Sequence, residues 1–555
     1  MTTSHERRDR DEAFEIETVR EHLRVLSVRS GFAALVASGL RIGLDLGAVM
    51  ILARLLTPTD FGLIAMVLPV ILLAGSVAHL GLQPAVLHME RLSQPLLSSL
   101  FWLSLKLNGV VYAGLALSGP LLAWLYGDSR VTAIAVVWAA SLYGLSTAGL
   151  HEALLQRQLR FGTVVSAQTG SQAVAVAAAI AAALLGAGYW ALVARIVIGA
   201  WLRGAAIWVL SGWRPTRRVR PTAEVARGVR EMLSYGMGFS GYRLVSWFGQ
   251  QMDRLLIGTL AGAGVLGLYH NARRWAFFPF SQMFIPLREV AVSTLSRVRD
   301  EPARYRRYCR RGLLPLLAMP LPATAFIFVS ARDVILLLLG GQWLGAVPFF
   351  RLMCIAAFFG AIGQVSNWIY LTEGTTKRQF KWALVRTPVV LAAIGVGSRW
   401  GAYGVAVGFS AATVLMAYPT LAYCLHTSVL RMRDVLGAAW RPAVSSVGAA
   451  SALSLVVHAL PAFDALPDAL PDALTGSLPG SLLLELAVFA VSYLALWTAL
   501  PGGRHALKEV LSTAAALWSS EPLASASDSS EAAEAASQRS PGLAGRREPP
   551  RGRAG

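Results

Sequence analysis

The sequence predicts an all-α polytopic membrane protein with about 14 transmembrane helices, arranged as two pseudo-symmetric six-helix lobes plus two C-terminal helices. Three observations predict this class: the composition, a succession of long apolar runs, and an offset of 205 residues that relates the two halves. The chain of 555 residues is 55% hydrophobic and only 15% charged, whereas a soluble domain carries about 25% charged residues. This composition excludes a water-soluble globule, a disordered chain and a disulfide scaffold.

A membrane-spanning helix needs about 20 mostly apolar residues, and fourteen such runs follow one another along the chain. The segment ahead of the first run has mixed charge, the run is too long for the apolar part of a signal peptide, and no A-x-A-like cleavage site follows it. We therefore expect the first run to stay as a transmembrane helix. The expected spans are 31–53, 63–86, 99–125, 131–148, 169–186, 188–210, 233–260, 266–290, 312–339, 346–371, 382–398, 401–425, 442–461 and 481–500.

The distribution of Lys and Arg predicts the orientation, because these residues collect in the cytoplasmic loops of membrane proteins. With the N-terminus inside, the inside segments up to the last span hold 28 of them, and the outside segments hold only Arg54, Arg130 and Arg399. One missed or invented span would reverse every later loop and destroy this separation. We therefore expect an even number of spans and both termini in the cytoplasm.

An internal repeat divides the spans into two halves. Both halves start from the same side, so the repeat is parallel, with its axis along the membrane normal. The identities at the offset of 205 are Gly31 with Gly236, Leu55 with Leu260, Gly62 with Gly267, and Leu63 with Leu268. The expected domains are a cytoplasmic N-terminal segment (1–29), a first six-helix lobe (30–210), a basic cytoplasmic linker (211–232), a second six-helix lobe (233–425), two extra transmembrane helices (426–500) and a cytoplasmic tail (501–555), disordered at least from about residue 520.

Charged residues inside the spans are the candidate functional residues, because an ionisable group in a bilayer is costly unless it faces a cavity or a partner. Cations outnumber acids in the first eight spans, and the planar fork of Arg can donate two parallel hydrogen bonds to a phosphate. This excess predicts an aqueous cavity between the two bundles that holds an anionic ligand. The candidate cavity residues are Arg41, Arg243, Arg254, Arg273, Arg274 and Lys106, and the candidate coupling or cavity-pair acids are Asp45 and Asp253.

The competing interpretation of these charges is structural. Arg41 with Asp45, and Asp253 with Arg254, would then form internal ion pairs, and cations near span ends would reach the lipid headgroups. The loop 291–311 carries seven Arg. We expect this loop to lie along the inner leaflet, where anionic lipids attract basic residues.

The sequence indicates no cofactor, no metal site and no nucleic-acid partner. The three cysteines lie far apart without metal-ligand spacing. The net charge of +19 is explained by basic cytoplasmic loops, because no nucleic-acid-binding motif accompanies it. The longest outside segment, 462–480, has the composition of a spacer, so we expect no catalytic domain there.

Five stretches of the chain also carry a family resemblance. They are ILARLLTPTDFGLIAMV (51–67), AHLGLQPAVLHME (78–90), LLQRQLRF (154–161), DRLLIGTLAGAGVLGLYHNARR (253–274) and LLLLGGQWLGAVPFFRL (336–352). In order and spacing they resemble Wzx-type oligosaccharide flippases, and most closely the colanic-acid and teichuronic-acid exporter type, within the multidrug/oligosaccharidyl-lipid/polysaccharide exporter superfamily. The chain departs from that pattern in its long N-terminal segment, its long tail and Arg332 in the ninth span.

The resemblance implies a flippase of the bacterial plasma membrane, not an enzyme. Its expected substrate is an undecaprenyl-pyrophosphate-linked oligosaccharide for exopolysaccharide, O-antigen or capsule synthesis, moved by alternating access of the two lobes. Anionic inner-leaflet lipids and a polysaccharide polymerase or other assembly proteins are the expected further partners. The alternatives are a multidrug/cation antiporter of the same fold, which would favour acids in the cavity, a membrane-embedded polysaccharide polymerase or glycosyltransferase, and a lipid II flippase.

Overall fold

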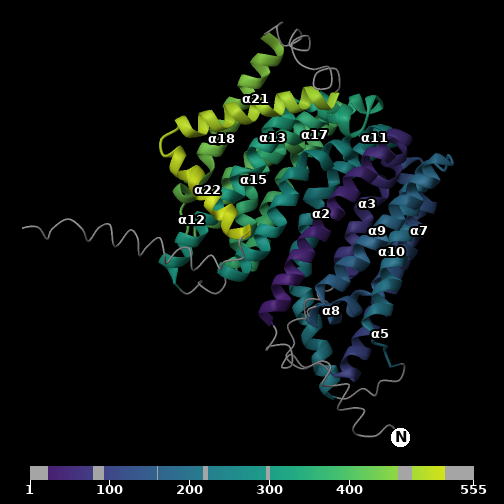
Figure 1. The fold of residues 1–555 in the computed structure, drawn as a ribbon. Helices are drawn as coiled ribbons and strands as arrows, with labels where there is room; N and C mark the ends of the chain where they lie inside the picture. The colour runs from purple at the N-terminus through teal and green to yellow at the C-terminus, as the bar shows by residue number, and fades with distance from the viewer. Residues whose placement is uncertain are drawn as a thin grey trace, which may run out of the picture. The chain divides into compact units, whose positions relative to one another are not determined.

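The computed structural model describes residues 23–78, 93–158, 160–216, 223–295, 301–459 and 478–518, and the regular structure within these ranges is entirely helical (Figure 1). Within these ranges, the side chains of 23–38, 76–78, 223–243, 280, 283–294, 376, 458–459, 478–479 and 513–518 are not described. The expected N-terminal segment up to residue 22, the outside segment 462–477 and the expected disorder from about residue 520 lie outside the described residues.

Each of the fourteen predicted spans overlaps a helix, so the predicted all-helical membrane fold is confirmed. Ten stretches of the described residues are long and apolar enough to cross a membrane. Lys377–Leu425 contains two predicted spans, and Leu244–Pro279 covers parts of two, 233–260 and 266–290. The predicted spans 31–53 and 442–461 fall outside these ten stretches and correspond to helices α2 and α18.

The first half of the molecule contains six of the predicted spans. The predicted span 99–125 is divided at Ser118, shortly before Pro120, because a proline within a helix removes a backbone donor and crowds the preceding turn. The helices of this half are α2 (Leu23–Leu55), α3 (Pro58–Ala78), α5 (Gln94–Leu117), α6 (Gly119–Tyr126), α7 (Arg130–Ser146), α8 (Gly149–Arg157), α9 (Phe161–Leu184) and α10 (Tyr189–Ser211).

The second half contains the next six spans. The predicted span 312–339 consists of three helices, which meet at Met319 and Ser330. Pro320 follows Met319 directly, and a residue before proline is disfavoured in helical conformation. The helices of this half are α11 (Ala223–Leu295), α12 (Pro302–Ala318), α13 (Pro320–Val329), α14 (Ala331–Leu338), the 3₁₀ turn η3 (Gly341–Ala346), α15 (Val347–Thr372), α16 (Thr376–Gly397), the 3₁₀ turn η4 (Ser398–Trp400) and α17 (Gly401–Leu425).

Gly262 divides α11 into the two predicted spans. Its φ of 72° and ψ of −175° are non-helical, and glycine adopts this region without the steric cost that other residues incur. Asp253 and Arg273 form an ion pair across the turn. Twenty residues of straight helix would hold them about 30 Å apart, so the two segments of α11 run back alongside each other.

The two halves contact each other through a reciprocal pair of glycines. A Cβ added to Gly62 would lie 1.7 Å from the carbonyl oxygen of Ala263, and one added to Gly267 would lie 1.9 Å from that of Pro58. The offset of 205 relates Pro58 to Ala263 and Gly62 to Gly267. Each half therefore presents the same surface to the other, which is the contact expected of a two-fold axis between parallel repeats.

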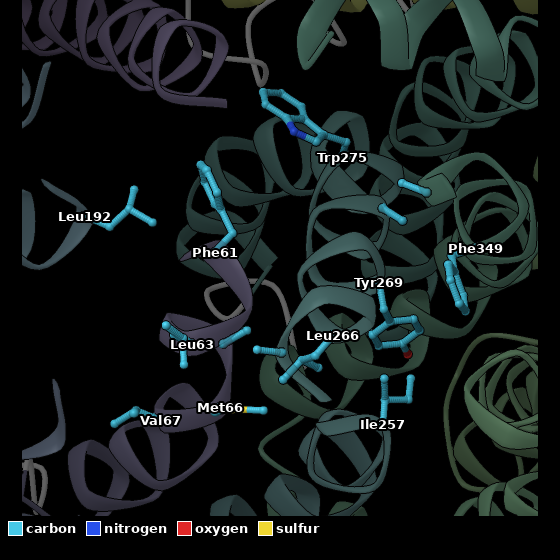
Figure 2. Packing of buried hydrophobic residues seen from close by; sticks show 14 of the residues in the cluster. Phe61, Leu63, Met66, Val67, Leu192, Ile257, Leu266, Tyr269, Trp275 and Phe349 are labelled. Carbon is cyan, nitrogen blue, oxygen red and sulfur yellow. The ribbon is translucent and has the colours of Figure 1, made fainter. Parts of the chain in front are cut away.

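One hydrophobic core extends across this contact. It includes Leu63 and Met66 of α3 together with Ile257 and Leu266 of α11, and the side chains of Met66 and Leu266 lie between the two helices (Figure 2). The indole Nε1 of Trp343 in η3 donates to the carbonyl oxygen of Ala53 at 2.8 Å. Hydrophobic packing and backbone contact thus hold α3 against α11 (Figure 1).

Two extra helices, α18 (Met432–Ala459) and α21 (Leu478–Ala499), follow the second half. α18 packs against α12 and α13, and Arg306 donates two hydrogen bonds to Asp434 at 2.8 and 3.0 Å. On α21, the ring centre of Phe489 lies 5.5 Å from that of Phe326 on α13. The extra helices are therefore anchored to the second half.

The structure differs from the sequence prediction mainly at helix ends. α2 begins at Leu23, within the expected N-terminal segment, and α11 begins at Ala223, within the expected linker. The described residues fall into two compact units, which divide between Leu496 and Trp497. The second unit contains α22 (Gly503–Trp518), a helix that the sequence analysis did not predict for the start of the tail.

Candidate functional site

A cavity of about 440 Å³ lies inside the second half, between α11, α15, α16 and α17. We call it the second-half cavity. Its volume falls in the range of small-molecule sites, roughly 300–1,000 Å³. Arg254, Arg273, Arg274 and Arg386 line it, and no Asp or Glu is among the described residues that do so. A lining whose charged residues are all positive attracts anions.

The turn at Gly262 assembles one end of this cavity. Asp253 is fully buried and accepts hydrogen bonds from the Tyr269 hydroxyl and the Arg273 guanidinium. The guanidinium carbon of Arg273 lies 4.4 Å from the ring centre of Phe409, which also lines the cavity. Asp253 and the aromatic face together fix the position of Arg273.

Arg254 and Arg274 supply positive charge that no carboxylate neutralises by direct contact within the described part of the chain. Arg254 donates to the neutral amide of Gln251, and its buried Nε has no hydrogen-bond partner among the described residues. The guanidinium carbon of Arg274 lies 5.8 Å from the ring centre of Trp275. Because an uncompensated cation in a membrane interior is costly, a bound anion would stabilise this end of the cavity.

The first half contains a separate polar network centred on Glu152 of α8. Glu152 is 8% exposed and accepts hydrogen bonds from Arg203 at 2.7 Å and from Gln168 at 3.2 Å. Arg41 joins the network by donating to Gln168 at 3.3 Å. This network links α2, α8, α9 and α10 within the first half.

Asp45 belongs to a second ion pair in the first half. It accepts a hydrogen bond from Arg195 of α10, and Arg41 is engaged elsewhere. The pair joins α2 to α10 within the first half, and neither residue lines the second-half cavity.

The predicted cavity residues fall into two groups. Arg254, Arg273 and Arg274 share the second-half cavity, which lies inside one half and not between the two bundles as we expected. Arg41 and Lys106 are exposed on first-half helices and do not line this cavity. The side chain of Arg243 lies outside the described residues.

Several polar residues of the two sites were not singled out from the sequence. Gln364 and Asn367 interrupt the apolar span 346–371, and that interruption is a signal that could have revealed them. Glu152 gave no such signal, because it falls in an expected cytoplasmic loop, where charge is common. Within the described ranges, no group of three or more His, Cys, Asp or Glu is placed to hold a metal ion.

The fold and this cavity define a helical membrane protein built from two related halves. The chain matches the inward closed conformation of the lipid II flippase MurJ with a TM-score of 0.63, over 84% of this chain and 98% of that one, at 13% identity. It matches an inward-facing multidrug resistance MATE family transporter of the MOP superfamily with a TM-score of 0.53, over 74% and 98%, at 14% identity. At such low identities these matches show the fold alone.

The chain belongs to the polysaccharide biosynthesis protein family, whose model matches residues 51–348. It is 22% identical over 435 residues to the lipopolysaccharide biosynthesis protein WzxC of Escherichia coli, covering 78% of this chain and 86% of that relative. It is 24% identical over 371 residues to the succinoglycan biosynthesis transport protein ExoT of Rhizobium meliloti, covering 66% and 73%. These relatives confirm the Wzx-type resemblance found in the sequence.

Proposed function

We propose that this protein is a flippase that moves an undecaprenyl-pyrophosphate-linked oligosaccharide across the bacterial plasma membrane for exopolysaccharide, O-antigen or capsule synthesis. The observation that carries the proposal is the second-half cavity, lined by four arginines and by no described carboxylate. A pyrophosphate supplies the missing negative charge, and arginine matches its geometry. The similarity to WzxC, a lipopolysaccharide biosynthesis protein, and to ExoT, a succinoglycan biosynthesis transport protein, supports a role in polysaccharide biosynthesis and transport.

A multidrug/cation antiporter would share the fold but would need acids facing its ligand. Asp253, the carboxylate that pairs with Arg273 of this cavity, is held by Arg273 and Tyr269 and does not itself line the cavity. A polysaccharide polymerase or glycosyltransferase would need a water-facing catalytic site. The arginine-lined cavity therefore favours anion translocation over both alternatives.

In the proposed cycle, Arg254 and Arg274 bind the pyrophosphate while Asp253 holds Arg273 beside them. The glycan stays in water and the polyprenyl tail stays in lipid. The two lobes, 30–210 and 233–425, rock against each other, so the contact at Gly62 and Gly267 opens and closes. Asp45 and Asp253 are the candidates for coupling this motion to an ion gradient, because protonation of either carboxylate would release the arginine that it holds.

The orientation follows from the basic residues. With both termini in the cytoplasm, the end that carries the Gly62 and Gly267 contact faces outward. Exposed arginines at the opposite end would then meet the anionic lipids of the inner leaflet. These arginines are Arg304, Arg307 and Arg310 on α12, Arg431 just before α18, and Arg433 on α18. A polymerase or other assembly protein would receive the flipped product on the outer side.

Binding of undecaprenyl pyrophosphate to the purified protein, followed by native mass spectrometry, tests the phosphate site. We expect Arg254→Gln and Arg274→Gln each to weaken binding roughly 10- to 100-fold, because a hydrogen bond to a charged group contributes about 1.5–3 kcal/mol. Arg351→Gln is the matched control, since Arg351 is exposed on α15 and does not line the cavity. Equal binding by all three variants would place the phosphate site elsewhere, and Arg41→Ala would then test the first half.

Transport is tested in cells that lack the gene. We expect undecaprenyl-linked oligosaccharide to accumulate on the inner leaflet. Wild-type protein should relieve the accumulation, and the double variant Arg41→Ala with Arg254→Ala should not. Increased drug sensitivity without accumulation would favour the antiporter instead.

A further inference from the structure

The end of the second-half cavity remote from the arginine cluster has a different chemical character. It is lined by the amides Asn367 and Gln379 and by the aromatic rings of Tyr370 and Trp382, with Thr420 beside them. Asn367 and Tyr370 lie in the last turns of α15, and Gln379 and Trp382 lie in the first turns of α16. We call this region the amide–aromatic end.

The two ends of the cavity are far apart. Phe409, which packs against Arg273, and Thr420 both line the cavity from α17. Eleven residues of helix separate them, which corresponds to about 16 Å of rise. A diphosphate, whose two phosphorus atoms are bridged by a single oxygen, cannot occupy both ends, so the amide–aromatic end must accommodate another part of the ligand.

The amide pair is fixed in position and retains hydrogen-bonding capacity. Gln379 is 7% exposed, and its Nε2 donates to Oδ1 of Asn367 at 2.6 Å. A primary amide offers two donors and one acceptor oxygen with two lone pairs. The one hydrogen bond between the two amides therefore leaves donors and an acceptor for ligand hydroxyls. Both amides are uncharged, which suits a neutral part of the ligand.

The indole of Trp382 is held as a rigid plate. Its Nε1 donates to Oγ1 of Thr420 at 3.1 Å, and its ring stacks on Tyr423 with centres 4.8 Å apart and planes 21° apart. The guanidinium carbon of Arg378 lies 4.5 Å from the Tyr423 ring centre. Tyr423 therefore covers one face of the indole, and Trp382 itself lines the cavity.

We propose that the amide–aromatic end is a saccharide subsite that binds the sugar attached to the diphosphate. A pyranose ring has C–H groups on its faces and hydroxyls around its rim. Trp382 offers an apolar plate to the C–H groups, and Asn367 and Gln379 offer hydrogen-bond donors and an acceptor to the hydroxyls. The plate and the amides are fixed before the ligand binds, so little ordering cost opposes binding. This inference rests on the proposed function, because the arginine end must hold the diphosphate.

The test compares two probes, undecaprenyl pyrophosphate and undecaprenyl-pyrophosphoryl-glucose, by native mass spectrometry of the full-length protein. We expect wild type to bind the glucose conjugate about fivefold more tightly, in line with the contribution of an aromatic contact. Trp382→Ala and Asn367→Leu should each remove most of this gain while keeping the Kd for undecaprenyl pyrophosphate within about twofold. That retained binding also reports that the variants are folded.

Two further variants serve as a conservative replacement and as a control. Trp382→Tyr keeps an aromatic plate and should retain part of the gain. Trp440→Ala removes an exposed tryptophan of α18 outside the cavity and should retain all of it. Equal affinity of wild type for both probes, or a full gain in Trp382→Ala and Asn367→Leu, overturns the saccharide subsite. Failure of wild type to bind undecaprenyl pyrophosphate overturns the proposed function itself.

Discussion

Asp253 is the acid that shapes the arginine end of the second-half cavity. It is fully buried and is held by Arg273 and Tyr269. Removing one partner of a buried ion pair leaves the other charge uncompensated, at a cost of about 3 kcal/mol. We therefore expect Asp253→Asn to lower the Tm of the purified protein in detergent, measured by tryptophan fluorescence.

The control for this prediction is Asp128→Asn. Asp128 pairs with Arg130 at 2.7 Å near the protein surface, where an ion pair contributes about 0–1 kcal/mol. The double variant Asp253→Asn with Arg273→Met should recover most of the lost stability, because it removes both buried charges. An unchanged Tm in the single Asp253 variant would contradict the pairing.

Asp434, at the start of α18 and ahead of the predicted span, makes a pH-dependent contribution. Burial alone would raise the pKa of this carboxyl, but hydrogen bonds from Arg306 and from the backbone of Arg431 outweigh burial and hold its pKa below the usual value. A lowered folded-state pKa stabilises the fold above the unfolded pKa of about 3.9, and this stability is lost as the pH falls through the folded value.

We therefore expect Asp434→Asn to lower the Tm at pH 7. The difference from wild type should shrink as the pH falls below about 4. Melting curves over this pH range measure the effect. A difference in Tm that does not change with pH would show that the variant acts by packing alone.

The sequence predicted which residues are charged inside the membrane but not which ones pair. Their proximity in sequence suggested ion pairs between Arg41 and Asp45 and between Asp253 and Arg254. In the structure, Asp45 pairs with Arg195, and Asp253 pairs with Arg273. These partners come from other helices or from across the Gly262 turn. A pattern of local spacing cannot reveal them, because they depend on how the helices pack.

Among the elements, α3 and the two segments of α11 determine how the halves meet. Apolar runs of sufficient length were enough to predict that these helices exist. Apolarity could not predict that Gly62 and Gly267 are contact points, since glycine is common in apolar runs. The offset of 205 aligns these two glycines with each other, so the internal repeat indicates that the two positions are equivalent, which hydropathy alone does not.

Gly62→Ala and Gly267→Ala test this contact. Each new Cβ would lie less than 2 Å from a backbone oxygen of the other half, at 1.7 and 1.9 Å, so the halves would have to separate. Alanine normally stabilises a helix by up to about 1 kcal/mol relative to glycine. We expect the opposite sign at these two positions, with a lower Tm and impaired relief of oligosaccharide accumulation.

Gly47→Ala on α2 is the matched control, because no atom lies within 4 Å of the position where its Cβ would be built. Its Tm should be unchanged or slightly higher. If Gly62→Ala and Gly47→Ala behaved alike, the backbone contact between the halves would not exist in the protein as it folds in a membrane.

At the scale of the whole molecule, the proposed cycle has the two halves separate at the end near Gly62. Their relative motion can be blocked by a bond across this end. A Cβ built on Gly264 would lie 3.4 Å from Oγ1 of Thr59, the atom whose place a cysteine sulfur would take. This approach is compatible with the Cβ separation of about 3.5–4.5 Å found in disulfides. Thr59→Cys with Gly264→Cys should therefore form a disulfide between the halves.

We expect the double-cysteine variant, made with Cys309, Cys354 and Cys424 replaced by Ala, to fail to relieve oligosaccharide accumulation in cells. Each single-cysteine variant should relieve it, because neither can lock the halves. A membrane-impermeant reductant added outside should restore the double variant, since the proposed orientation places this end on the oxidising outer side. Full activity with the disulfide formed would exclude rocking of the halves, and insensitivity to the outside reductant would reverse the orientation.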